Sequence, residues 1–102
     1  MPDTPFPAIT ASVWQPGAAQ ALAGQGATVR PVFVRAGHVA ARHHHDFEQF
    51  LYVAHGGGTL QGEAGPVTLA PGTALHLPAG AWHSAVFDTD TLLVEVNLNP
   101  AA

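Results

Sequence analysis

Residues 37–56 read GHVAARHHHDFEQFLYVAHG and place three consecutive histidines ahead of an apolar run. Side chains alternate between the two faces of an extended strand, so the odd-numbered positions from 43 to 53 would share one face. Those positions carry His43, His45, Phe47, Gln49, Leu51 and Val53. Glu48 falls on the opposite face and would reach the same ion only if a β-bulge shifted the register. The pattern predicts that His43, His45 and Gln49 can converge on one metal ion.

A second stretch, residues 72–83, reads GTALHLPAGAWH and predicts a short strand, a Pro-Ala-Gly turn and a further strand. If it lies beside the first stretch, His83 adds a third imidazole from a distant part of the chain. The chain contains no cysteine, so its metal ligands are limited to nitrogen and oxygen donors. We therefore expect a set of four metal ligands, namely His43, His45, Gln49 and His83.

Together the two stretches resemble the two motifs of the cupin superfamily. One motif is Gly, five residues, His-x-His, an acidic or amide ligand and a later Gly; the other is Gly, five residues, Pro-x-Gly, two residues and His. The matching positions are Gly37, His43, His45, Gln49 and Gly56, then Gly72, Pro78, Gly80 and His83. The chain departs from the pattern where Gln49 replaces the usual glutamate and Phe87 an asparagine. The resemblance implies an all-β fold, the jelly-roll-like barrel called a double-stranded β-helix.

The resemblance also implies a divalent transition metal as cofactor, with iron, manganese, nickel, zinc and copper all open. The form His-x-His-x-x-Glu-Gln and the tail 91–100 are similar to pectin-degradation cupins that open unsaturated uronate rings. This similarity implies an enzyme for a small, oxygen-rich molecule, acting by sugar-acid ring opening or isomerisation, or by dioxygenase chemistry as in quercetinase-like cupins. A neutral ligand set would leave the ion its full charge as a Lewis acid. A non-catalytic cupin that binds or senses a small ligand is the alternative, and a metal-free structural protein is a third hypothesis.

No lysine or cysteine is present to act as a general base, and Glu48 is the weak side-chain candidate that remains. Five residues are expected to line the pocket. Phe47, Leu51 and Phe87 have odd numbers like the predicted ligands and should lie on the same strand faces, and Phe33 and Arg35 come from the preceding strand. Phe50 and Tyr52 have the opposite parity, so we expect them to face outward, where they could pack a dimer interface.

The composition sets the domain count and excludes some partners. The 102 residues suit one domain, with 1–8 as a lead-in and 9–100 as the barrel. Only 10% of residues are charged and 47% are hydrophobic, which favours a homodimer that covers apolar surface. Three arginines and no lysine against seven acidic residues argue against a nucleic-acid partner. No apolar run is long enough to span a membrane.

The absence of cysteine and of a signal peptide pattern favours a cytoplasmic protein. The resemblance to cupins implies that its partner is a small molecule. Short apolar stretches separated by Gly and Pro predict about nine strands. The first would be an edge strand over 9–14, and 15–26 could form a short helix or a loop. Pro31 predicts an edge or a bulge in the strand over 28–36.

Overall fold

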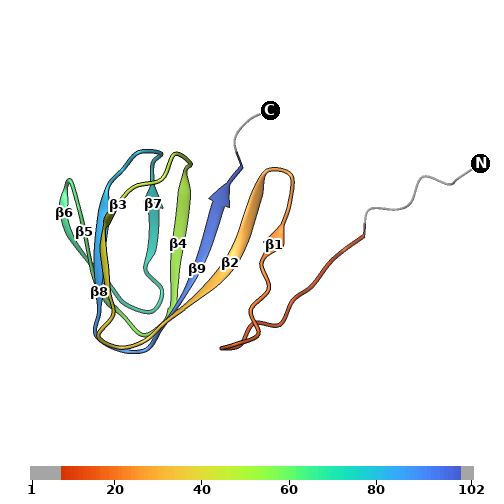
Figure 1. The fold of residues 1–102 in the computed structure, drawn as a ribbon, viewed down its shortest axis with the longest axis horizontal. Helices are drawn as coiled ribbons and strands as arrows, with labels where there is room; N and C mark the ends of the chain where they lie inside the picture. Colours follow the sequence, from red (N-terminus) through yellow and green to blue (C-terminus); the bar gives the residue numbers. More distant parts are fainter. Residues whose placement is uncertain (1–7, 100–102) are drawn as a thin grey trace, which may run out of the picture.

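The computed structural model describes residues 8–99 and contains only strands and loops in that range (Figure 1). The nine strands are β1 (Leu22–Ala23), β2 (Ala27–Val34), β3 (Val39–His43), β4 (Gln49–His55), β5 (Gly58–Gly62), β6 (Gly65–Leu69), β7 (Ala74–Leu77), β8 (His83–Phe87) and β9 (Thr91–Leu98). The predicted lead-in therefore lies outside the described residues except for Ala8. Within the described part, no helix is long and apolar enough to cross a membrane.

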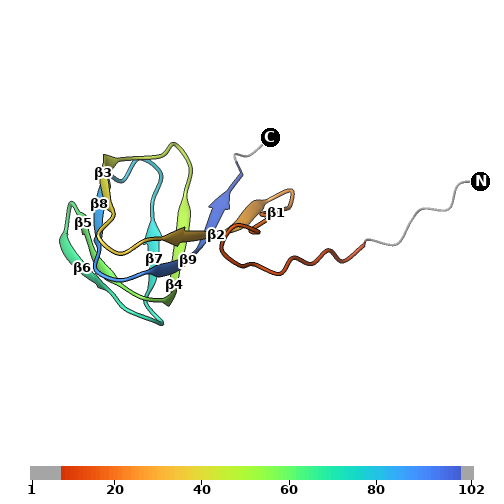
Figure 2. The same cartoon turned by 60° about the horizontal axis from the view of Figure 1, so that its bottom comes forward.

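The strands form two antiparallel sheets that make the walls of a barrel (Figure 2). The larger sheet has the order β1-β2-β9-β4-β7, and the smaller has the order β3-β8-β5-β6. Consecutive strands often lie in different sheets, as β2 and β3 do, so the chain crosses repeatedly from one wall to the other. This arrangement confirms the predicted all-β jelly-roll fold.

The core lies between the two sheets and is built from inward-facing apolar residues of both. Its buried members are Leu51, Val53, Leu60, Leu69, Leu77, Ala85, Phe87 and Leu93. Gln49, Leu51 and Val53, which alternate along β4, are buried, as expected for a strand with one face on a core. Val53 has no exposed surface at all.

The stretch 43–53 does not form the single strand that its alternation predicts. β3 ends at His43, residues 44–48 form a loop, and β4 begins at Gln49. His43 therefore belongs to the smaller sheet and Gln49 to the larger one. The polar run from His44 to Asp46 has no sheet partner, and this lets the chain cross between the walls. The predicted ligands approach from opposite sides of the barrel instead of along one strand.

The N-terminal part also differs from the prediction. Residues 9–14 form no strand, and residues 15–26 contain only an isolated bridge between Gln15 and Ala18 and the two-residue β1. Pro31 pairs with Val94 of β9 on one side, while β1 pairs only with residues 28 and 29 on the other. The side of β2 that faces away from β9 is thus a free edge at Pro31, where a missing N–H is tolerated.

The two faces of β9 carry the reverse of the usual pattern. Thr91 and Leu93 are buried against the core, and Glu95 continues the same face into the barrel interior. The outward face is fully apolar and consists of Leu92, Val94, Val96 and Leu98. An apolar outer face on a central strand is unusual for a solvated sheet.

Candidate metal centre

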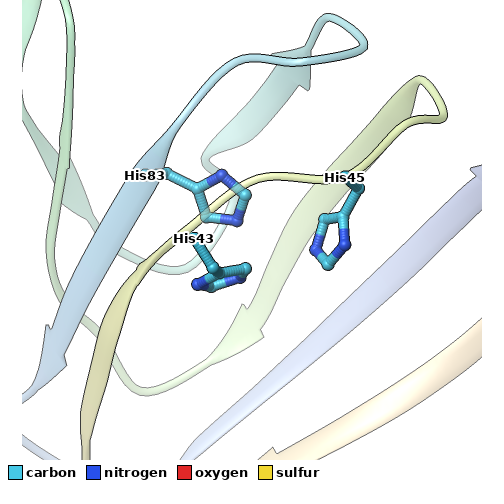
Figure 3. Close-up of side chains that lie close together, drawn as sticks. All are labelled: His43, His45 and His83. Carbon is cyan, nitrogen blue, oxygen red and sulfur yellow. The ribbon is translucent and has the colours of Figure 1, made fainter.

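Three histidines meet at one end of the barrel (Figure 3). His43 closes β3 and His83 opens β8, and the two are direct cross-strand partners. His45 lies two residues further along the loop to β4. One ring nitrogen from each of the three lies within 4.8 Å of the others. The structure thus brings together the three imidazoles that the sequence predicted as ligands.

Backbone contacts fix the orientation of two of these rings. The Nδ1 of His43 lies 2.7 Å from the carbonyl oxygen of Ala41, and the Nδ1 of His83 lies 3.2 Å from that of Ala81. A carbonyl oxygen only accepts hydrogen bonds, so each Nδ1 must carry the proton. The Nε2 of a neutral ring then holds the free lone pair. Histidines that bind metals use this arrangement, in which one nitrogen donates to the protein and the other coordinates.

The environment of His83 favours its neutral form. Burial lowers the pKa of His83 below its usual value of 6.5, and the nearby rings of His43 and His45 lower it further. The hydrogen bond to Ala81 and the charge of Glu95 act in the opposite direction but are outweighed. Only a neutral imidazole can coordinate a metal. His83 is therefore held in the protonation state that a ligand requires.

Contacts with two further residues hold His45 in the loop. The ring of Phe47 stacks on that of His45, with 4.8 Å between centroids and 19° between planes. The backbone N–H of Gly80 donates to the carbonyl oxygen of His45 at 2.7 Å. Gly80 has φ of 81°, a left-handed conformation that glycine adopts without strain. The Pro-Ala-Gly turn of the second stretch therefore anchors the histidine loop of the first.

Gln49 enters from the opposite sheet and is only 4% exposed. Its Nε2 donates to Oδ1 of Asn97 at 2.8 Å, and Nδ2 of Asn97 lies 3.5 Å from Oε1 of Glu95. A carboxylate can only accept hydrogen bonds, so the Asn97 amide must turn its NH₂ toward Glu95 and its oxygen toward Gln49. Gln49 must then donate to that oxygen through its own NH₂. The carbonyl oxygen of Gln49 is then left free. This amide oxygen is the atom that a metal would use.

Glu48 points away from the centre. Its Oε2 lies 2.5 Å from Nε2 of His76 on the outside of the barrel, and the ring of Phe50 stacks on His76. No register shift brings Glu48 toward the histidines. It therefore also fails to approach the centre as the general base proposed from the sequence. The even parity assigned to Glu48 agrees with this placement, and Gln49 is the residue that faces the interior.

The donors present fit a divalent metal. Three neutral imidazoles and one amide oxygen supply nitrogen and oxygen ligands, and the tautomers of two rings are set by the backbone. Metal–nitrogen bonds of about 2.0–2.1 Å require ligand nitrogens to stand about 3.0–3.4 Å apart. The observed limit of 4.8 Å needs only small rotations of the side chains. Metal binding by this set stays a prediction, and nothing in the donor set selects one metal.

The centre opens into a cavity of about 200 Å³ that runs into the barrel. All four predicted ligands line it, with Glu95, His38 and mainly aliphatic side chains. Of the predicted wall residues, Leu51 and Phe87 line this cavity. Phe33 and Arg35 instead line a hollow on the outer face beside β9, because odd-numbered residues of β2 face outward. Phe47 contacts His45 but is not part of the cavity wall.

The sequence interpretation missed Glu95, Asn97 and His38. His38 lies at the far end of the cavity, with its ring centroid 6.3 Å from that of Phe87. Glu95 and Asn97 occupy the inner face of β9, whose opposite face is wholly apolar. The rule that apolar faces point inward therefore assigns this strand the wrong way round. A single carboxylate in the middle of an apolar strand was the only available signal.

Comparisons with known proteins agree with this geometry. The sequence pattern of the cupin domain matches residues 32–97, which is more than half of the chain. No curated protein matches the chain. Among solved structures, KdgF from a Halomonas species superposes with a TM-score of 0.73 and 25% identity, over 85% of this chain and 83% of that one.

Two other solved structures show similarity of fold. An RmlC-like cupin from Shewanella frigidimarina has a TM-score of 0.73 and 20% identity, over 80% of this chain and 75% of its own. The DMSP lyase DddQ from Ruegeria pomeroyi has a TM-score of 0.70 and 21% identity, over 80% of this chain and 46% of its own. From the family match, the two-sheet barrel and these neighbours, the chain belongs to the cupin family.

Proposed function

We propose that this cupin is a metal-dependent isomerase that opens the ring of a small sugar acid. The observation that carries the proposal is the placement of one carboxylate, Glu95, in the same cavity as a neutral set of metal ligands. The resemblance of the two motifs to pectin-degradation cupins and the likeness to KdgF support it. A volume of about 200 Å³ is below the about 300–1,000 Å³ of drug-sized pockets. It suits a substrate with a single ring.

His43, His45, His83 and Gln49 would hold the metal ion. When bound, a divalent ion supplies Lewis-acid stabilisation of negative charge on a substrate oxygen. The protein's own contribution is a ligand set without a carboxylate, so that no negative ligand charge reduces this effect. The aliphatic wall formed by residues such as Leu51 and Leu60 limits water around the substrate.

Glu95 would move the proton. Its Oε1 faces Arg30 and Asn97, whereas Oε2 has no hydrogen bond within residues 8–99. The side chain is 19% exposed, so it is reachable from the cavity but largely shielded from water. Oε2 can take the proton of the substrate's ring hydroxyl and return it to the ring oxygen as the carbon–oxygen bond breaks. No electron is gained or lost, so the step needs no oxidant.

Oxygen consumption distinguishes this proposal from the dioxygenase hypothesis. Cleavage by dioxygen consumes oxygen, whereas ring opening does not. Untagged protein of measured metal content is incubated with unsaturated uronates and, separately, with flavonols while ultraviolet absorbance and oxygen uptake are followed. We expect loss of the uronate chromophore without oxygen uptake. Oxygen uptake with a flavonol would replace the proposal with dioxygenase chemistry, and tight binding without turnover would favour a sensor.

Two variants test the roles assigned within the cavity. General acid–base catalysis contributes about 10²–10⁴-fold, so Glu95→Gln should lower kcat by at least about 100-fold. A second variant, His45→Ala, tests the ligand set, and His44→Ala is its matched control. His44 is exposed and lies between two predicted ligands in the sequence, but it is not part of the histidine cluster. His44→Ala should keep its metal and activity, whereas His45→Ala should lose both. Equal loss in the two histidine variants would contradict the assigned ligand set.

A further inference from the structure

One arginine lies beside the cavity, next to Glu95, which lines it. The chain has three arginines and no lysine. The guanidinium carbon of Arg42 lies 4.0 Å from the centroid of the Trp82 ring, and Arg35 lines the hollow on the outer face. Arg30 has the same parity on β2 as Val32 and Val34, both of which line the cavity. Of the three, Arg30 is the cation that can reach a molecule in the cavity.

Glu95 holds Arg30 in an orientation that leaves donors free. The two residues are cross-strand partners between β2 and β9, and Nε of Arg30 lies 3.5 Å from Oε1 of Glu95. The Arg30 side chain is 53% exposed, and within residues 8–99 its guanidinium makes no hydrogen bond. The terminal N–H groups therefore remain available. Two parallel N–H groups of a guanidinium match the two oxygens of a carboxylate.

The charges of the cavity favour an anion. The imidazoles and the amide of Gln49 are neutral ligands, and the opposite charges of Arg30 and Glu95 cancel. A bound divalent ion would leave an excess positive charge in a largely apolar cavity, where charge interactions are strong. We propose that Arg30 is a specificity residue that binds the carboxylate of the substrate. This deepens the proposed function and rests on it.

Two matched sugars test this assignment without requiring turnover. D-Galacturonate and D-galactose differ in that a carboxylate replaces a hydroxymethyl group, and their binding to the full-length, metal-assayed protein is measured by isothermal titration calorimetry. A charge-assisted bidentate contact corresponds to about tenfold or more in affinity. We expect galacturonate to bind at least about tenfold more tightly than galactose. Arg30→Gln should remove this preference, and Arg30→Lys should restore part of it because lysine keeps the charge without the fork.

Arg35→Gln is the matched control, since it removes an equal charge from the outer face. Unchanged galacturonate binding in Arg30→Gln, or equal loss in Arg35→Gln, would overturn the assignment, as would a wild-type protein that binds neither sugar. If galacturonate binding depends on Arg30 but no uronate is converted, the specificity role stands and the proposed isomerase fails. With an active substrate, Arg30→Gln should raise KM while kcat changes little.

A second inference comes from the outer face of the larger sheet. This face, called the β2–β9–β4 surface, is apolar and includes Phe33, Val94, Val96, Phe50 and Tyr52. Phe50 is 41% and Tyr52 47% exposed, and a shallow hollow lies between them. The segment before β1 runs away from the barrel with Ile9 97% and Val13 86% exposed (Figure 1). Apolar groups are thus exposed on both the sheet and the N-terminal segment.

We infer that the β2–β9–β4 surface binds the same surface of a second copy, with residues 8–14 of each chain packing on the other. Three strands about 4.8 Å apart and up to about 26 Å long give a plan area of about 370 Å². A stable interface buries about 800 Å² on each partner, so the sheet alone falls short and the N-terminal segment would supply the remainder. A two-fold contact is also the commonest symmetry for such a surface.

Sedimentation velocity of the full-length protein tests the interface. We expect a dimer for the wild type at micromolar concentration and a monomer for Tyr52→Glu. The double variant Ile9→Asp/Val13→Asp should weaken the dimer at least about tenfold. Val86→Glu is the control, because Val86 is 46% exposed on the smaller sheet. A monomeric wild type, or dissociation by Val86→Glu alone, would overturn this inference; circular dichroism verifies that each variant folds.

Discussion

Replacement of Gln49 by glutamate tests the account of the buried polar chain. The wild-type amide donates to Oδ1 of Asn97, and Asn97 in turn is directed by Glu95. A carboxylate at position 49 would place two acceptors against each other. Rotation of the Asn97 amide would not relieve this, because its oxygen would then face the Glu95 carboxylate. Without metal, Gln49→Glu must therefore destabilise the fold.

The size of the effect can be bounded. A lost hydrogen bond that leaves a buried group unpaired costs about 1–3 kcal/mol. The new carboxyl can instead stay protonated, which at pH 7 costs about 3.7 kcal/mol from a reference pKa of about 4.3. We expect a loss of about 2 kcal/mol, which for a domain of this size lowers Tm by about 8–16 °C. A bound divalent ion should reverse much of this, since the carboxylate is then a charged ligand.

Thermal unfolding followed by circular dichroism, with EDTA and with added Co²⁺, measures both effects. Gln61→Glu is the control, because Gln61 is exposed on β5 and its replacement should change Tm little. A metal-free Gln49→Glu protein that melts within about 2 °C of the wild type would refute the described hydrogen bonds. Stabilisation by Co²⁺ that is no larger in Gln49→Glu than in the wild type would refute the placement of this side chain beside the ion.

Three further predictions concern stability. Burial lowers the pKa of His83, so the unfolded chain takes up a proton before the folded protein does as the pH falls below about 6.5. The metal-free protein should therefore lose stability between pH 7 and pH 5, and a Tm that stays constant over that range would contradict this. Gly58→Ala would drive its new Cβ into the backbone carbonyl of Val86 and should lower the urea midpoint by the equivalent of about 1–3 kcal/mol, whereas Gly26→Ala meets no atom and should not. Val53→Ala removes two methyl groups from a fully buried side chain and should cost about 1–3 kcal/mol in the same assay.

The fold class and three convergent imidazoles were accessible from the sequence because local patterns specify them. Glycines and prolines separate the short strands, and the turn at Gly80 has the left-handed φ that its glycine predicts. The parity argument selected His43, His45 and Gln49, although the strand it assumed is broken over 44–48. All three face the interior because the loop crosses from one wall to the other.

The remaining features depend on pairing between distant strands, which local patterns do not contain. Glu95 and Arg30 become neighbours only through the register of β2 with β9. Phe33 and Arg35 were assigned to the pocket because nothing in β2 alone states which face is inward. The apolar outer face of β9 makes the same point, since a strand with one wholly apolar face would be placed with that face in the core.

Anomalous diffraction from a crystal of the metal-loaded, untagged protein tests the metal centre most directly. The account predicts one strong peak at the open end of the barrel, about 2.0–2.2 Å from a ring nitrogen of His43, His45 and His83 and from Oε1 of Gln49. A peak at the exposed His44 instead, or no peak among the three imidazoles despite stoichiometric metal in solution, would contradict it.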